Sequence, residues 1–381
     1  MSYLKIFFFM LCMILVSCTG QKTGKENDNN DKIAIEVGEI KFPPQDVLQL
    51  KSYYLSSSVH VDSIDYLIGY NYRLHSLDCM NLKSKSVTQI VLPGDGPDAI
   101  VRLSGIYAQS LDSVWISDES ERAFLIDSVG TIKRMIDLKK YLEDEEQLLI
   151  NTNYAMFTSH LFYNASRHSL MFLVKHTPSN TFIVKEVFID EVGKMATYQL
   201  SSSKVVPDMS KGYAYINFPN VNFVGENIVY NYPVESSIYM LDIRTNERKY
   251  ILADSHYTSN IIEKCTTSGD YATLEKHWLE NSHFYDIMYL PKYKIYARLH
   301  ADKVDFDEKK GMEKLINERD LYLMLFDENM EKIGETKLSN CRYSPFTSWN
   351  ATYGGIALFV DNVLDEKNNT DDLTIDIISL K

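Results

Sequence analysis

Tyr296, Arg298 and His300 have the residue types and the spacing of a polar site on one β-strand. Alternate side chains of a strand share a face, so these three project together, away from the apolar residues between them. An arginine and a histidine inside packed β-sheets need polar partners or water. Two interpretations follow. Either the three residues bind a ligand at a channel or an end pocket, or Arg298 is paired internally and serves only the fold.

Other groups of polar residues indicate less chemistry. Asp302, Asp305, Asp307 and Glu308 offer the oxygen ligands that Ca²⁺ prefers, but they lack the residue order of an EF-hand and lie among lysines. The sequence has no Gly-x-Ser-x-Gly elbow, no Walker A loop, no His-Glu-x-x-His motif and no Cys-x-x-Cys pair. The sequence therefore identifies no metal site, no cofactor and no catalytic residue.

The strand that carries Arg298 belongs to a unit that recurs along the chain. Each unit consists of an apolar strand, a polar turn and a second apolar strand that ends in an acidic or polar residue. The six copies are Tyr66–Asp78, Val114–Asp127, Leu170–Asp190, Ile228–Asp242, Ile295–Asp327 and Ile356–Leu380. Apart from the fifth, which holds a long polar insertion, they recur near the period of roughly 40–50 residues of propeller blades.

Six such units predict an all-β fold, a six-bladed β-propeller that spans residues 33–381 as one domain. A small twisted sheet cannot cover both its apolar faces alone, so the blades should stack around an axis. Residues 33–55 are expected to lend a strand to the sixth blade and close the ring. Two β-sandwiches in tandem are the alternative, although no Pro/Gly-rich linker divides the middle of the chain.

Three segments depart from the β pattern and are predicted to be short helical insertions, near residues 138–149, 270–282 and 307–319. The last two flank or interrupt the fifth unit, and long connections on a rigid scaffold often carry binding function. The connection between the first two units contains Gly94, Gly96 and Pro97. Glycine tolerates positive φ and proline fixes its own φ, so this stretch is interpreted as a sharp structural turn.

Two motifs suggest a family. The stretches GDGPD (residues 94–98) and LDSVW (residues 111–115) resemble a signature of uncharacterised Bacteroidetes lipoproteins with a six-bladed propeller. YDIMYLPKYKIYAR (residues 285–298) and GET (residues 334–336) are similar to the same family, but Leu290 and Ala297 stand where its pattern has Asp and Tyr. The resemblance implies the propeller fold and supplies no catalytic residue, because the family has no assigned activity.

The N-terminus has the pattern of a lipoprotein signal peptide. Lys5 precedes the apolar run Ile6–Val16, which is too short to span a bilayer. LVSC (residues 15–18) resembles a bacterial lipobox, which implies removal of residues 1–17 and lipidation of Cys18. Residues 18–32 contain no large apolar side chain and should form a flexible tether. The lipid is expected to anchor the protein to the outer membrane, on its periplasmic side or at the cell surface.

The chain is acidic, with 52 Asp and Glu residues against 39 Lys and Arg residues. Because contacts with phosphates require basic surface, nucleic acid is not an expected partner. Besides Cys12 and Cys18, the chain has Cys79, Cys265 and Cys341, so at most one disulfide can form among these three. Buried free thiols are the simpler expectation, and the sequence does not indicate an oligomeric state.

These observations favour a lipid-anchored module of the cell envelope that binds a glycan or a protein, and an enzyme is the less favoured interpretation. The 26 tyrosines offer flat faces with a polar edge for such ligands, although packing between blades also uses them. The enzymatic alternative, a propeller lyase or lactonase with a site at the channel mouth, needs His or carboxylate groups from several blades. The second alternative is a structural subunit of an envelope assembly, which would show an exposed apolar patch on one rim.

Cys18→Ser is expected to move the protein from the membrane fraction to the soluble extracytoplasmic fraction, because the substitution removes the lipid acceptor. Cell fractionation and immunoblotting measure this distribution. Cys12→Ser, within the segment expected to be removed, is the matched control. Unchanged membrane retention of Cys18→Ser would contradict the lipoprotein assignment.

Overall fold

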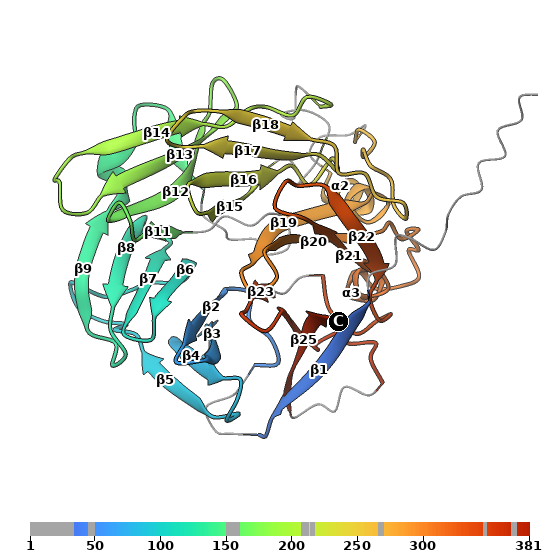
Figure 1. Ribbon diagram of the computed structural model, residues 1–381, viewed down its shortest axis with the longest axis horizontal. Helices are drawn as coiled ribbons and strands as arrows, with labels where there is room; N and C mark the ends of the chain where they lie inside the picture. Colours follow the sequence, from blue (N-terminus) through green and yellow to red (C-terminus); the bar gives the residue numbers. More distant parts are fainter. Residues whose placement is uncertain are drawn as a thin grey trace, which may run out of the picture. The chain divides into compact units, whose positions relative to one another are not determined.

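Six small antiparallel sheets surround a common axis and form the blades of a propeller (Figure 1). The structure, a computed structural model, describes residues 34–44, 50–149, 161–206, 213, 218–265, 270–345, 349–366 and 372–381. All of these residues belong to one compact unit, residues 33–381. The predicted six-bladed propeller is confirmed. The signal peptide, Cys18 and the tether lie outside the described residues.

The first three blades follow one another along the chain. The first contains β2 (Ser56–Val61), β3 (Ile64–Asn71), β4 (Ser76–Asn81) and β5 (Val87–Val91). The second contains β6 (Leu103–Ser110), β7 (Ser113–Asp118), β8 (Arg122–Ile126) and β9 (Ile132–Asp137). The third contains β12 (Ser169–His176), β13 (Thr181–Phe188) and β14 (Met195–Gln199). Its remaining strands, β10 (Glu146–Leu148) and β11 (Phe162–Asn164), both pair with β12.

The other three blades repeat this order. The fourth contains β15 (Asn220–Val224), β16 (Asn227–Asn231), β17 (Ile238–Asp242) and β18 (Arg248–Ile251). The fifth contains β19 (His283–Leu290), β20 (Ile295–Ala301), β21 (Leu321–Phe326) and β22 (Lys332–Lys337). The sixth contains β23 (Trp349–Ala351), β24 (Ile356–Phe359), β25 (Leu373–Leu380) and β1 (Ile35–Phe42).

The repeated unit of the sequence forms the two central strands of every blade. In β21 (LYLMLF) every residue is buried, because neighbouring blades cover both faces of the sheet. The outer strand β14 (MATYQ) instead alternates exposed and half-buried residues. A continuous apolar run is therefore found only where the sheet is covered on both sides. This explains why the sequence pattern identified the central strands more readily than the inner and outer ones.

The ring is closed by a strand from each end of the described chain. β1 pairs antiparallel with β25 over its whole length, from Ile35 opposite Leu380 to Phe42 opposite Leu373. Arg342 reinforces this pair, because it donates to Glu39 of β1 (Nη2 to Oε2, 2.9 Å) and to Asp376 of β25 (Nη2 to Oδ1, 3.0 Å). The expectation that the segment 33–55 completes the sixth blade is confirmed for β1.

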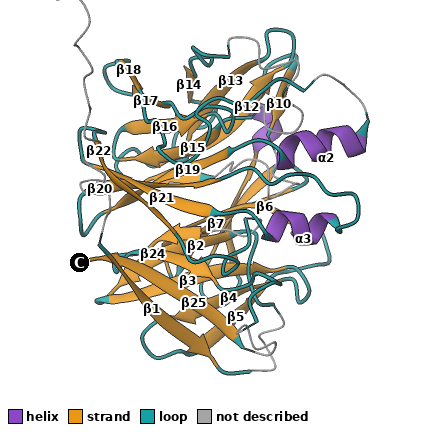
Figure 2. Ribbon diagram, turned by 90° about the vertical axis from the view of Figure 1, so that its right-hand side faces the viewer, coloured by secondary structure: helices purple, strands orange, loops and turns teal. Residues whose placement is uncertain are grey.

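The helical insertions fall where the sequence predicted them. The first begins with the 3-10 turn η1 (Leu138–Tyr141) and continues into β10 rather than into a longer helix. The helices α2 (Tyr271–Leu279) and α3 (Met312–Asn317) lie on the same face of the ring (Figure 2). Within the described part of the chain, neither these helices nor any other is long and apolar enough to span a membrane.

Each blade contains a carboxylate that is fully shielded from solvent. These residues are Asp78, Asp118, Glu186, Glu235, Glu335 and Asp376. In the first blade, Asp78 accepts hydrogen bonds from the hydroxyl of Tyr53 (2.7 Å) and from the amide of Asn71 (2.9 Å). In the sixth, Asp376 accepts from Tyr343 (2.8 Å) and from Arg342. A buried charge is strongly unfavourable without such donors, so these contacts fix strands to one another.

A chain that begins at Pro44 lacks β1 and is expected to aggregate and to lose its cooperative thermal transition, because β25 becomes an exposed sheet edge. A chain that begins at Ile33 retains β1 and is the control. Size-exclusion chromatography with light scattering and a thermal melt compare the two. The closure argument fails if the shorter chain is monomeric and melts like the control.

Candidate functional site

Tyr296, Arg298 and His300 lie on β20, inside the interface between the fourth and fifth blades. Arg298 and His300 are 0% exposed and Tyr296 is 6% exposed. The three residues share a strand as predicted, and that they bind a ligand stays a prediction. Neighbouring elements cover both faces of β20, so the side chains meet protein groups instead of a channel. Arg298 is instead paired inside the protein, which is the other interpretation of the sequence.

Arg298 is held by backbone carbonyl groups of the fourth blade. Its guanidinium donates to the carbonyl oxygens of Ser236 (2.5 Å) and Ala253 (2.9 Å). The rings of Phe284 and Phe326 flank it, with centroids 4.8 and 5.6 Å from the guanidinium carbon. Burial lowers the pKa of Arg298 to about 9, and the charge of Glu335 limits this shift. The side chain therefore stays charged at neutral pH and joins two blades.

His300 extends this network to Glu335 on β22. Its Nε2 lies 2.8 Å from Oε1 of Glu335, and its Nδ1 lies 3.2 Å from the hydroxyl of Thr258. Burial by itself raises the pKa of Glu335. Hydrogen bonds from His300, from the Ser255 hydroxyl (2.6 Å) and from the backbone of His256 (3.0 Å) outweigh burial and lower this pKa to about 2. Burial lowers the pKa of His300, so a neutral imidazole meets an ionised carboxylate.

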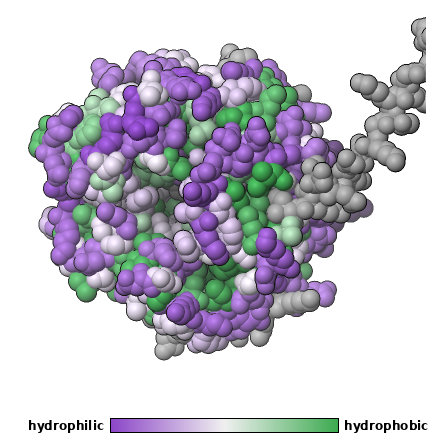
Figure 3. Space-filling model, viewed as in Figure 1, coloured by the Kyte–Doolittle hydropathy of each residue, from purple (hydrophilic) through white to green (hydrophobic). Residues whose placement is uncertain are grey.

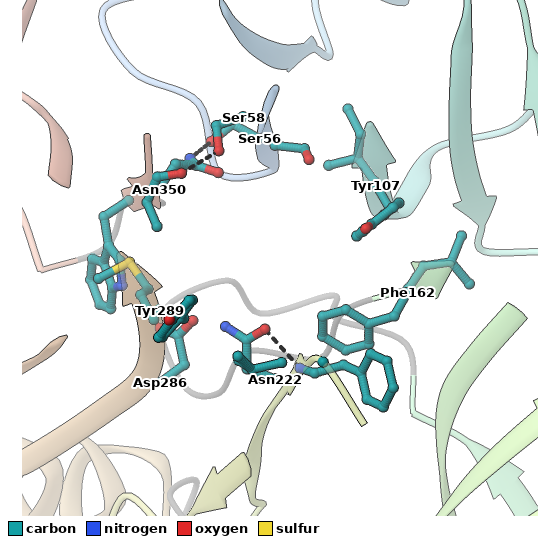
Figure 4. Close-up of a pocket in the computed structure, with 17 residues that line it drawn as sticks. Ser56, Ser58, Tyr107, Phe162, Asn222, Asp286, Tyr289 and Asn350 are labelled. Carbon is teal, nitrogen blue, oxygen red and sulfur yellow. Dashed lines mark hydrogen bonds between the residues drawn. The ribbon is translucent and has the colours of Figure 1, made fainter. Parts of the chain in front are cut away.

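The candidate site is a cavity of about 370 Å³ on the axis, which strands from all six blades line (Figure 4). The face of the molecule in Figure 3 is visibly hollowed at its centre. The lining residues are Ser56, Ser57 and Ser58 of β2; Ile106 and Tyr107 of β6; Leu161 and Phe162 at β11; Asn222, Phe223, Val224 and Gly225 at β15; Asp286, Met288 and Tyr289 of β19; and Trp349, Asn350 and Ala351 of β23.

A β-bulge brings the carboxylate of Asp286 to this cavity. β19 and β20 pair at Phe284 with His300 and again at Ile287 with Arg298, so that two residues of β19, Tyr285 and Asp286, oppose one residue of β20. A bulge of this kind bends the strand and redirects its side chains. Tyr285 packs against Trp349 with ring centroids 4.6 Å apart, while Asp286 lies beside Tyr289 at the cavity wall (Figure 4).

The rest of the cavity has a polar side and an aromatic side. On the polar side, the amide of Asn350 donates to the hydroxyl of Ser56 (2.6 Å), and Asn222 donates to the carbonyl of Ile287 (2.8 Å). On the aromatic side, Phe162 lies between Tyr107 and Phe223, with centroids 6.3 and 6.5 Å away. Such an arrangement can place an apolar face of a ligand on rings and its polar edge against amide, hydroxyl and carboxylate groups.

Two tyrosines add hydroxyl groups to this lining. Burial raises the pKa of Tyr107, and the phenol of Tyr163 raises it further. Burial and the nearby carboxylate of Glu328 raise the pKa of Tyr289, whose hydroxyl lies 3.4 Å from that carboxylate. Both phenols keep their protons at neutral pH, and that of Tyr289 donates to Glu328.

The sequence did not identify these residues as a site. Asp286 is the one acidic residue in HFYDIMYL, the sequence of β19, and this interruption of the strand was the available signal. Gly94, Gly96 and Pro97 lie in the connection between β5 and β6 and do not line the axial cavity. Gly96 has a φ of 89°, a value that suits glycine. Cys79, Cys265 and Cys341 form no disulfide with one another, and no cluster of metal-ligating side chains is found among the described residues.

Comparisons with known proteins support the fold. A family model described as "Domain of unknown function (DUF4221)" matches residues 26–337. A DUF4221 member from Bacteroides vulgatus has a solved structure with a TM-score of 0.73 and 14% identity, covering 92% of this chain and 99% of that chain. A candidate exported protein from Bacteroides fragilis gives a TM-score of 0.55 and 13% identity, covering 92% and 97%. No curated protein matches the chain.

Arg298→Ala is expected to lower the free energy of unfolding by about 3–5 kcal/mol, because it removes the positive charge near Glu335 and leaves two buried carbonyl groups without a donor. Urea unfolding measures the change. Arg244→Ala, at a side chain 65% exposed in the fourth blade, is the control and should change stability by less than about 0.5 kcal/mol. Equal stability of the two variants would show that Arg298 does not hold the blades together.

Proposed function

The chain belongs to the DUF4221 family, as its predicted resemblance indicated, and from this premise we propose that it is a lipid-anchored extracytoplasmic module that binds a small polar ligand in its axial cavity. The family description assigns no activity, so the proposal depends on the residues of this chain. The lipobox-like residues 15–18 support the anchor. The description of the Bacteroides fragilis relative as a candidate exported protein supports a place outside the cytoplasm.

The observation that carries the proposal is the convergence of six blades on one cavity. Its volume of about 370 Å³ falls within the range of ligand sites, roughly 300–1,000 Å³. A small number of polar groups on a largely pre-formed wall is what orients a ligand in such sites. Here these groups are the carboxylate of Asp286, the amides of Asn222 and Asn350, and the serine hydroxyls of β2.

The chemistry of the wall defines the ligand. Asp286 is 4% exposed, and a carboxylate accepts hydrogen bonds most strongly from cationic or polarised donors in such surroundings. A hydroxyl or amine group facing Asp286, with an apolar face against Tyr107 and Phe162, fits both sides of the cavity. The end residue of a glycan or an amino sugar has this combination. A protein partner would need a contact area of about 800 Å² on each side, which an axial cavity does not offer.

The enzymatic alternative, a lyase or lactonase, needs histidine or carboxylate groups from several blades at the axis. Among the described residues that line the cavity, Asp286 is the one carboxylate and none is a histidine. One carboxylate with amides and hydroxyls is a set that anchors and orients a ligand. Binding is therefore the function that this geometry favours over catalysis.

Asp286→Asn is expected to weaken binding of amino and neutral monosaccharides by about tenfold or more, because it removes the charge that strengthens the anchoring hydrogen bond. Isothermal titration with glucosamine, N-acetylglucosamine, galactose and mannose measures the affinities. Asp190→Asn, at a surface side chain 65% exposed, is the matched control.

Asn350→Ala tests the same cavity without changing its charge, and thermal melts of all variants separate lost binding from lost folding. Sugars that bind Asp286→Asn, Asn350→Ala and the parent protein equally would place the ligand elsewhere. Absence of binding to the parent protein at millimolar concentration would remove monosaccharides as ligands of the cavity.

A further inference from the structure

A second cavity, of about 570 Å³, shares no lining residue with the axial one. Its lining residues are Tyr54, Leu55, Tyr70, Tyr72, His75 and Arg102. They come from the start of β2, the turn between β3 and β4, and the start of β6. All of these positions lie on one face of the ring, at the boundary of the first and second blades. The helix α2 lies on the same face of the ring (Figure 2), because it precedes the innermost strand of its blade, β19, as Tyr54 and Leu55 precede β2.

Two tyrosines form an exposed aromatic wall of this cavity. Tyr54 and Tyr72 are 42% and 48% exposed, and their rings stack with centroids 6.3 Å apart and planes inclined by 29°. Leu55 and Tyr70 lie deeper, at 7% and 6% exposure. The tyrosines of the core clusters, in contrast, are buried between blades. Exposed, paired aromatic rings over a concave apolar floor are typical of a surface that binds something.

Polar groups lie beside the rings. Nδ1 of His75 is 3.2 Å from the hydroxyl of Tyr70, whereas Nε2 of His75 is buried and has no partner among the described residues. When the Tyr70 hydroxyl donates to Nδ1, Nε2 carries the proton and is a hydrogen-bond donor. Arg102, whose side chain is 50% exposed, adds further donors. The cavity therefore combines flat apolar faces with donors for ligand oxygen atoms.

The charges around the cavity disfavour an anion. Nε of Arg102 lies 3.6 Å from the carboxylate of Glu119, so its charge is already offset. The connection that follows β5 carries the exposed residues Asp95 and Asp98. A Cβ atom on Gly94 of this connection would lie 3.7 Å from the ring of His75, so the acidic segment borders the cavity. With a net charge of −13 on the whole chain, an acidic ligand would be repelled.

We propose that this cavity binds a neutral oligosaccharide. Pyranose rings have carbon faces that can cover Tyr54 and Tyr72, and hydroxyl oxygen atoms that accept from His75 and Arg102. A neutral chain meets no repulsion from Asp95 and Asp98. The site is separate from the axial cavity, so the protein would bind an extended sugar chain here in addition to a small polar ligand on the axis. A peptide is the other class of ligand that tyrosine pairs recognise, and the experiment separates the two.

The experiment is isothermal titration of the whole mature protein with maltohexaose, cellohexaose, xylohexaose and mannohexaose, and with acidic hexagalacturonate. At least one neutral hexasaccharide is expected to bind. Tyr72→Ala should weaken that binding by roughly tenfold through loss of one stacking face. Tyr72→Phe keeps the ring and should bind like the parent protein. Tyr353→Ala is the matched control, because Tyr353 is also 48% exposed and stacks on His60 in a different place.

Several results would overturn the proposal. One is that no neutral hexasaccharide binds at millimolar concentration, and another is that hexagalacturonate binds more tightly than the neutral sugars. A third is that Tyr72→Ala and the parent protein bind with equal affinity. The fourth is that a displayed library yields peptides, in place of sugars, whose binding depends on Tyr72. Tyr72→Ala separates the two cavities, since it should weaken hexasaccharide binding and leave monosaccharide binding in the axial cavity unchanged. Loss of that binding in Asp286→Asn but not in Tyr72→Ala would assign the sugar to the axial cavity instead.

Discussion

Each charged group buried between the blades needs partners on the next strand or the next blade, and this requirement determines where the polar residues of the ring lie. Glu335 accepts from His300 within its own sheet and from Ser255 of the preceding blade. Arg298 reaches the same preceding blade through two carbonyl groups. Glu235 accepts from the hydroxyl of Tyr239 through Oε1 (2.9 Å), but its Oε2 has no partner among the described residues, and burial raises its pKa. The boundary of the fourth and fifth blades is therefore held by polar contacts as well as by apolar packing.

The same boundary supports the axial cavity. Asp286 belongs to a bulge in β19, and the two register positions around that bulge pair with His300 and Arg298 of β20. His300 and Arg298 thus help to fix the strand that presents the carboxylate to the axis. Binding groups are effective when neighbouring contacts hold them in one geometry, and this pair of strands provides such support. Asp286, which lines the cavity, and Arg298 and His300, which support its strand, therefore lie on one pair of strands.

The sequence predicted the fold better than the site, for a physical reason. Central strands such as β21 are covered on both faces and are therefore continuous apolar runs. For this reason all six units could be recognised in the sequence. The cavity is built from short or polar inner strands such as β2 (SSSVHV) and β23 (WNA), which carry no such signal. The alternation around Arg298 gave the correct shared face, but its partners Ser236 and Ala253 lie 62 and 45 positions away in sequence. Only the folded chain shows whether an arginine on such a face meets solvent or another blade.

The pairing of β1 with β25 also has a consequence for biosynthesis. A ribosome makes β1 before every other described strand, yet the partner of β1 is made more than three hundred residues later. The hydrogen bond from Ser379 to Glu36 spans 343 positions, and contacts of such sequence separation form late and slowly. Throughout elongation the nascent β1 is an unpaired strand that has to be kept from pairing with other chains. The ring therefore becomes complete only after synthesis of all the strands between β1 and β25.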